Sequence, residues 1–332
     1  MGSSSSTWGR TSPQLYCRPS ADNGAGRGWS WAVQSFTRAP RALRFLMAAV
    51  VGAGLLTACS DDSAPGPSPV TGPLSILLVN DDGWDAPGIT SVYQALTKAG
   101  HRVTLVGPLE NQSGRSMATD VTAMEVTRPR GADAPIYAVD GTPVDALNVG
   151  LFGVLAGDPP DLVVSGVNKG ANVAANTSYS GTVGAAAAAA EAGLPAVAVS
   201  ADTDAQGESD FDDASRLVVE MVDQLAARGF EGLGRAGFLN VNVPAETASR
   251  REPRGVRAVP LATGGPRTVT YAQSGPTTWT PSFTYDPRVG RPSADAEQLA
   301  DGWSTVTWLT AARTSPSSRQ VEVDDLVDAL KR

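Results

Sequence analysis

From residue 74 onward, apolar runs without alternation are separated by polar turns and by stretches with helical periodicity. Residues 75–80 form the first such run, which is typical of a parallel strand buried on both faces. A polar turn at 81–88 follows, then apolar residues at helical spacing up to Gly100, and a second strand-like run at 101–106. This β-α-β pattern places Asp81 and Asp82 at the carboxyl end of the first strand, where open α/β sheets bind ligands.

The same pattern recurs further along the chain. Residues 161–168 form another buried run, which leads into a Gly-rich turn, and the Ala-rich segment 183–192 is a strong helix former. Two more runs, 196–200 and 238–243, are also strand-like. The sequence therefore predicts an α/β fold with a doubly wound, mostly parallel, Rossmann-like sheet.

The domain boundaries follow from where these patterns begin and end. One globular domain is expected over 74–332, with its core at 74–243 and an extension at 244–332. Within the extension, 250–292 favours hairpins and loops, and 321–330 has the apolar spacing of a closing helix.

The first 73 residues are interpreted as a targeting region that carries no fold. Residues 1–58 comprise an unstructured leader and a signal peptide, in which arginines precede the apolar run 45–56. That run is too short to span a bilayer, which takes roughly 20 residues. It ends in Leu56-Thr57-Ala58-Cys59, which resembles the lipobox of bacterial lipoproteins, and 59–73 is a Pro/Ser tether. We expect an extracytoplasmic protein anchored to the membrane only through lipid at Cys59; the alternative is a secreted soluble protein.

Composition excludes several classes of function. The net charge of −8 over 332 residues argues against a polynucleotide partner. His101 is the single histidine and opens a predicted strand, so a structural role is expected for it rather than that of a general base. Both cysteines, Cys17 and Cys59, precede the predicted domain, which rules out a disulfide framework or a cysteine-ligated zinc site within it.

Two adjacent carboxylates at a strand end are costly unless a cation is near, because like charges raise each other's pKa. Mg²⁺ and Mn²⁺ prefer oxygen ligands, so Asp81 and Asp82 are candidate ligands; the alternative is a simple polar turn that caps the next helix. Ser180-Gly181-Thr182 precedes the Ala-rich helix and has the form of a phosphate site at a helix N-terminus, or of an ordinary cap.

Several motifs, in order and at matching spacing, resemble those of the SurE family of metal-dependent survival-protein nucleotidases. They are Val79-Asn80-Asp81-Asp82-Gly83, Asn111-Gln112-Ser113-Gly114, Gly141-Thr142-Pro143, Ser165-Gly166-Val167-Asn168 and Tyr179-Ser180-Gly181-Thr182. The resemblance implies one divalent metal ion, Mg²⁺ or Mn²⁺, held by Asp81, Asp82, Ser113 and Asn168. It also implies a phosphate held by Asn80, Asn172, Ser180, Gly181 and Thr182, with Gly141-Thr142-Pro143 in the pocket wall.

The resemblance further implies the activity: a 5'-nucleotidase that hydrolyses nucleoside monophosphates to nucleoside and phosphate, in a homodimer or homotetramer. Asp81 and Asp82 are the expected catalytic residues, with a metal-activated water attacking phosphorus and Asp82 or a neighbouring carboxylate taking the proton. A dehalogenase-type phosphatase is disfavoured because Asn80 occupies the nucleophile position, and a serine hydrolase because Thr177 replaces the first Gly of its elbow. A lipid-anchored, non-enzymatic binding protein for a phosphorylated ligand is the remaining alternative.

Overall fold

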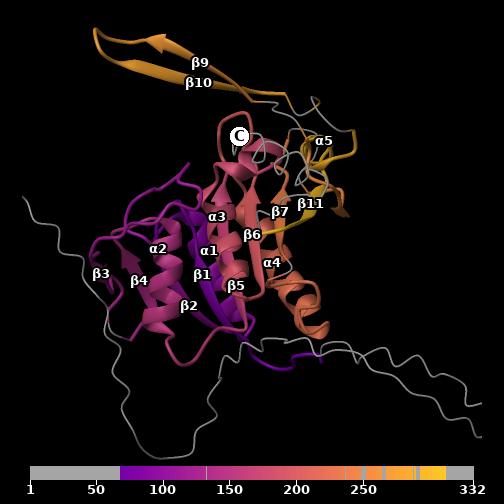
Figure 1. The fold of residues 1–332 in the computed structure, drawn as a ribbon. Helices are drawn as coiled ribbons and strands as arrows, with labels where there is room; N and C mark the ends of the chain where they lie inside the picture. The colour runs from indigo at the N-terminus through magenta and orange to yellow at the C-terminus, as the bar shows by residue number, and fades with distance from the viewer. Residues whose placement is uncertain are drawn as a thin grey trace, which may run out of the picture. The chain divides into compact units, whose positions relative to one another are not determined.

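The computed structural model describes residues 68–311, except 132, 236, 248–251, 264–266, 287 and 289–291. These residues form a nine-stranded sheet flanked by helices and a separate two-stranded hairpin (Figure 1). The sheet order is β3-β4-β2-β1-β5-β6-β7-β11-β8. Its strands are β1 (Ser75–Val79), β2 (Arg102–Pro108), β3 (Val126–Thr127), β4 (Ile136–Val139), β5 (Leu162–Lys169), β6 (Ala196–Ala201), β7 (Phe238–Val243), β8 (Val256–Ala258) and β11 (Ser304–Leu309).

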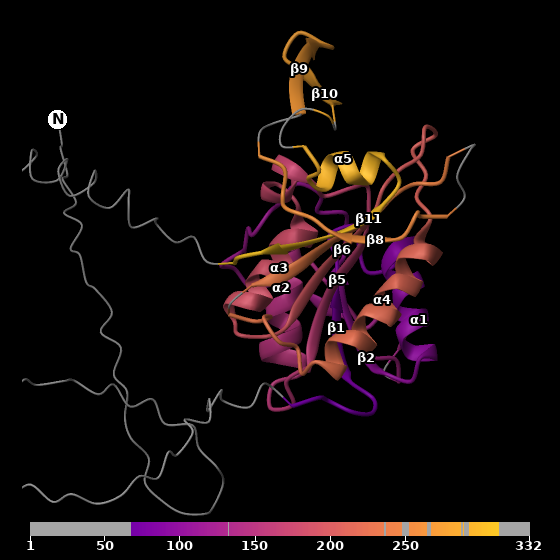
Figure 2. The same cartoon turned by 90° about the vertical axis from the view of Figure 1, so that its right-hand side faces the viewer.

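The six central strands, from β4 to β7, run parallel, which confirms the predicted fold class. Figure 2 shows the sheet edge-on, with α1 (Pro87–Lys98) and α4 (Phe211–Ala227) on one face and α2 (Pro143–Asn148) and α3 (Gly181–Glu191) on the other. Because both faces are covered, successive residues of β1 enter different cores: Leu78 packs on the α1 side and Leu77 on the α3 side. This burial explains why the sequence of β1 shows no alternation.

The predicted helices and strands of the core agree with the structure to within about two residues. The predicted strand 238–243 coincides with β7, and α3 begins two residues before the predicted 183. The earlier start has a local cause, since Ser180 caps α3 by accepting a hydrogen bond from Val183 N at 3.1 Å. Close packing also needs glycine at Gly88, where a Cβ would lie 2.0 Å from the carbonyl oxygen of Val167.

The predicted extension contributes to the same sheet as the core. β11 pairs antiparallel with β7, and β8 pairs parallel with β11. The expected hairpin is present as β9 (Arg267–Gln273) and β10 (Trp279–Tyr285), and α5 (Asp295–Ala300) follows it. The expected leader, tether start and closing helix at 321–330 lie outside the described residues. Among the helices described, none is long and apolar enough to cross a membrane.

A buried carboxylate joins the extension to the core. Asp295, the first residue of α5, is fully buried, and its side chain accepts hydrogen bonds from Ala174 N at 3.0 Å and from Ala262 N at 2.8 Å. Burial raises the pKa of Asp295, although the backbone donors act in the opposite direction. Ala174 has a φ of +50°, in the left-handed region, so this anchor holds a strained turn (Ala174–Ser178, a 3₁₀ helix) that leads into α3.

Candidate active site

The candidate site lies where the strand order reverses. From β1 the chain passes to β2 and β4 on one side, and from β5 to β6 and β7 on the other, so the carboxyl ends of β1 and β5 meet at a switch point. A cavity of about 480 Å³ opens there. Its lining includes three of the expected metal ligands, Asp81, Ser113 and Asn168.

Asp81 is held by the N-terminus of α3. Its side chain is only 3% exposed, and Thr182 Oγ1 donates a hydrogen bond to Asp81 Oδ1 at 2.5 Å. The backbone amides of Gly181 and Thr182 also favour the ionised carboxylate, but burial outweighs them and raises the pKa of Asp81. A Cβ at Gly181 would lie 2.8 Å from Asp81 Cβ, so only glycine allows this approach.

Asp82 lies beside the cavity and is not among its lining residues. Lys169 N donates to Asp82 Oδ2 at 2.9 Å, and Asn111 Nδ2 to Asp82 Oδ1 at 3.3 Å. Burial raises the pKa of Asp82 to about 6, and the negative charge of Asp81 contributes less strongly in the same direction. The hydrogen bond from the backbone amide of Lys169 lowers this pKa and offsets part of the effect. The end of β5 and the Asn111 loop thus orient the two oxygens of this carboxylate.

The two neutral candidate ligands are oriented by local hydrogen bonds. Asn168 Nδ2 donates to Gly170 O at 2.6 Å, which leaves the amide oxygen as the remaining ligand atom. Ser113 N donates to Asn111 Oδ1 at 2.9 Å, so Asn111 fixes both Ser113 and Asp82. The loop that carries them is tied to the site because Gln112 N donates to Asp81 O at 2.7 Å.

The expected phosphate-binding groups are only partly brought together, and the N-terminus of α3 differs from the expectation. Ser180 lines the cavity, but Gly181 and Thr182 do not. Their amides and the Thr182 hydroxyl act on Asp81 instead. The first turn of α3 therefore stabilises a carboxylate of the protein, in the position where the sequence suggested a bound phosphate.

Asn80, another residue of the expected phosphate-binding set, is fully buried and is not among the residues that line the cavity. Asn80 Nδ2 donates to Gly83 O at 2.7 Å, so it shapes the turn that carries the two aspartates. Asn172 does line the cavity, but its side chain is engaged, with Nδ2 donating to Ser200 Oγ at 2.9 Å.

The expected wall at residues 141–143 also differs. Thr142 caps α2 with Asp145, and neither it nor its neighbours line the cavity. Pro143 packs against the first residue of α3, since its Cγ would lie 2.9 Å from a Cβ placed on Gly181. His101 accepts a hydrogen bond from Leu74 N at 3.3 Å, at the amino end of β1, which fits the structural role expected of it.

Four further residues that line the cavity were not expected to bind a ligand: Lys169, Asn176, Phe283 and Tyr179, of which only Tyr179 stands in a quoted motif. A signal for Lys169 was present, because it directly follows the motif residue Asn168 and the sequence has no other lysine between Lys98 and Lys331. Phe283 had no comparable signal, since only the position of the β9–β10 hairpin brings it to the cavity.

The donor set fits a hard divalent cation. Within the described part of the chain, no three His, Cys, Asp or Glu side chains gather into a metal-binding group. The candidate set is instead two adjacent carboxylates, Asp81 and Asp82, with a hydroxyl and an amide oxygen from Ser113 and Asn168. Burial opposes the charge on both carboxylates, so a bound cation would stabilise them.

Fold and site together define a doubly wound α/β protein with an oxygen-donor site at its switch point. The family model described as survival protein SurE matches residues 76–266, and the chain therefore belongs to the SurE family.

Relatives and a solved structure agree with this assignment. Proteins named 5'-nucleotidase SurE from Xanthomonas campestris pv. campestris (strain B100) and Xanthomonas axonopodis pv. citri (strain 306) are each 44% identical over 171 residues, 52% of this chain. The match spans 64% of each relative, less than two thirds of its length. The crystal structure of SurE protein from Aquifex aeolicus has a TM-score of 0.63 and 27% identity, covering 78% of this chain and all of that one.

The contact between Thr182 and Asp81 gives a first prediction. Thr182→Val keeps the side-chain shape but removes the hydroxyl donor, so the affinity for Mn²⁺ should fall about 10- to 100-fold, as for other partners of metal ligands. Thr182→Ser should retain most of the affinity, and both variants should remain folded. Isothermal titration with Mn²⁺ measures the effect.

A control for this prediction is Thr307→Val, which removes a buried hydroxyl that has no partner among the described residues. Mn²⁺ affinity should not change in this variant. Equal affinity in Thr182→Val and the unmodified protein would show that the Asp81 contact does not support metal binding.

Proposed function

We propose that this protein is a divalent-metal-dependent phosphomonoesterase that hydrolyses nucleoside monophosphates to nucleoside and phosphate. The observation that carries the proposal is the buried Asp81 carboxylate at the edge of a switch-point cavity that also contains Ser113 and Asn168. The names of the SurE relatives support the same activity.

The chain's own residues have distinct roles in this proposal. Asp81, Asp82, Ser113 and Asn168 would hold one Mg²⁺ or Mn²⁺, which when bound lowers the pKa of water and neutralises charge on the phosphate. Asp82, beside the cavity, takes a proton from the attacking water. The water oxygen bonds to phosphorus as the bond from phosphorus to the nucleoside oxygen breaks, and the proton held by Asp82 passes to the leaving oxygen.

Other cavity residues bind the substrate. Asn172, Asn176 and Ser180 offer polar groups to the phosphate oxygens. Tyr179 and Phe283 line the same cavity and are each about half exposed, 55% and 54% respectively. Aromatic rings of this kind stack on nucleobases, which supports a nucleotide rather than a small aliphatic phosphate ester.

The main test is phosphate release from AMP. The protein should release phosphate in the presence of Mn²⁺ or Mg²⁺ and not in the presence of a chelator. Asp81→Ala should lower kcat/KM at least about a hundredfold, because it removes a charged ligand from the site. Asp158→Ala, which changes an exposed carboxylate remote from the cavity, is the matched control and should have no effect.

Two results would count against the proposal. Phosphate release that resists chelation would remove the metal from the mechanism. Binding of AMP without any turnover would favour the non-enzymatic binding protein instead.

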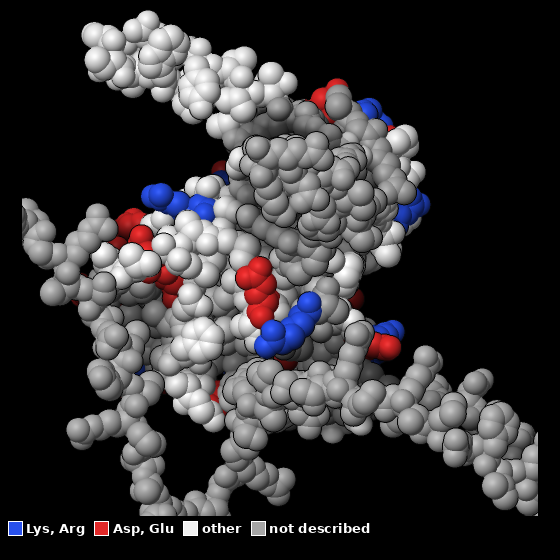
Figure 3. All heavy atoms as spheres, in the orientation of Figure 1, with Lys and Arg blue, Asp and Glu red and all other residues white. Residues whose placement is uncertain are grey.

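We also propose that the protein forms a homodimer or homotetramer. Val269, Tyr271 and Trp279 are exposed on the β9–β10 hairpin. Residues 268–284 contain no charged side chain, and the hairpin is uniformly white in Figure 3. Exposed apolar surface of this kind marks protein interfaces.

Light scattering should give two or four times the monomer mass. The double variant Tyr271→Glu with Trp279→Glu places charge on this surface and should reduce the measured mass. A monomeric unmodified protein would refute the proposal.

For localisation, we propose export and lipid attachment at Cys59. One acyl chain contributes about 0.8 kcal/mol per buried CH₂, so several chains should retain the protein on membranes through a salt wash. Cys59→Ser should release or misprocess it. Mass spectrometry of the mature N-terminus tests lipidation. An unmodified terminus, or one that does not start at Cys59, contradicts lipidation and leaves the proposed activity unaffected.

A further inference from the structure

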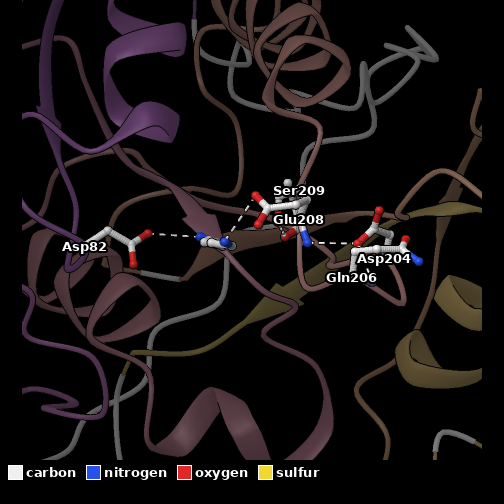
Figure 4. A network of polar contacts seen from close by, with 7 residues as sticks. Asp82, Asp204, Gln206, Glu208 and Ser209 are labelled. Carbon is white, nitrogen blue, oxygen red and sulfur yellow. Dashed lines mark hydrogen bonds and ion pairs between the residues drawn. The ribbon is translucent and has the colours of Figure 1, made fainter.

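Lys169 connects the aspartate turn to a second loop. It is the last residue of β5, and its backbone N–H is the donor to Asp82 Oδ2. Its ammonium extends the other way, with Nζ 3.4 Å from Glu208 Oε2. The two side chains are 45% and 76% exposed, so the pair is accessible to a ligand. Figure 4 shows these contacts linking Asp82 with Glu208 and its neighbours.

Glu208 is presented by a fixed turn. Asp204 Oδ1 accepts hydrogen bonds from Gln206 N at 2.9 Å and from Glu208 N at 2.8 Å, and Asp204 N donates to Glu208 O at 2.8 Å. Next to it, Ser209 Oγ donates to Ala201 O at 3.0 Å, which ties the turn to the end of β6. The backbone of Glu208 is therefore held in place, and its carboxylate meets Lys169 without rearrangement of the loop.

The charge of the cavity makes this lysine conspicuous. Lys169 is the one basic side chain among the described residues that line it, while Asp81 and the adjacent Asp82 bring negative charge. A phosphate monoester is itself an anion, so a cavity that binds it needs positive charge besides any metal ion. Lys169 lines the cavity, and its exposed, flexible side chain can supply this charge once the ammonium turns away from Glu208, which is not among the lining residues.

We propose that Lys169 is an anion-binding residue of this cavity, and that Glu208 is an internal competitor that holds the ammonium until a phosphate oxygen replaces it. The proposal rests on the proposed function and adds a specificity-determining pair to it. An exposed Lys–Glu pair is weak and easily exchanged. A hydrogen bond from an ammonium to a phosphate oxygen is short and charge-assisted, so the exchange favours the ligand.

The two residues predict opposite effects on anion binding. In Lys169→Gln the charge is lost, whereas the backbone N–H to Asp82 remains, so affinity for inorganic phosphate should fall about 10- to 100-fold. In Glu208→Gln the ammonium is released from its partner, and affinity should rise about two- to fivefold. With AMP, the same changes should appear mainly in KM, in opposite directions, with kcat little altered.

The experiment is isothermal titration of the full chain with inorganic phosphate in the presence of Mg²⁺. Lys98→Gln is the matched control, since it makes the same substitution at an exposed lysine on α1, outside the cavity. Thermal melts should be unchanged in all three variants, because both members of the pair are on the surface.

The outcomes separate this inference from the proposed function. Phosphate binding that is unaltered in Lys169→Gln, or absent in the unmodified protein, overturns the role of Lys169. Binding that weakens in Lys169→Gln but does not strengthen in Glu208→Gln overturns the competitor role of Glu208. If the opposite shifts occur but AMP is not hydrolysed, the anion site is supported and the phosphatase proposal fails.

Discussion

The site depends on one interaction, the stabilisation of the buried Asp81 carboxylate by the N-terminus of α3. A carboxylate removed from water is costly. The groups that act on the Asp81 carboxylate include no basic side chain. The Thr182 hydroxyl and the amides of Gly181 and Thr182 offset part of that cost. The contact fixes the position of α3 relative to β1, and with it the side of the cavity that Ser180 forms.

The surrounding packing follows from this contact. Gly181 must lack a Cβ so that Asp81 and Pro143 can approach it. The buried Asn80 holds the turn that carries the aspartates, because its side chain donates to Gly83 O. Asp82 is held by other groups, since Asn111 and the backbone N–H of Lys169 donate to its two oxygens. The two aspartates are adjacent in sequence but are held by different elements, Asp81 by the N-terminus of α3 and Asp82 by Asn111 and the end of β5.

The sequence predicted the core well because its signals are local. Unbroken apolar runs such as 75–80 and 238–243 report strands buried on both faces, and the Ala-rich segment reports its helix directly. The details of the site were less predictable, because they depend on contacts between distant residues. Thr182 meets Asp81 across 101 positions, so no local pattern shows that this helix end serves a carboxylate. The burial of Asn80 and the arrival of Phe283 likewise depend on tertiary packing.

The anchor at Asp295 has a consequence for the order in which the chain can assemble. Ala174 precedes Asp295 by 121 positions, and its amide depends on that carboxylate for a partner. During synthesis, the strands that carry Asp81 and Asn168 leave the ribosome long before α5 does. The strained turn that leads into α3 must therefore wait for the extension before it acquires this hydrogen bond, so the cavity reaches its final form only after most of the chain has been made.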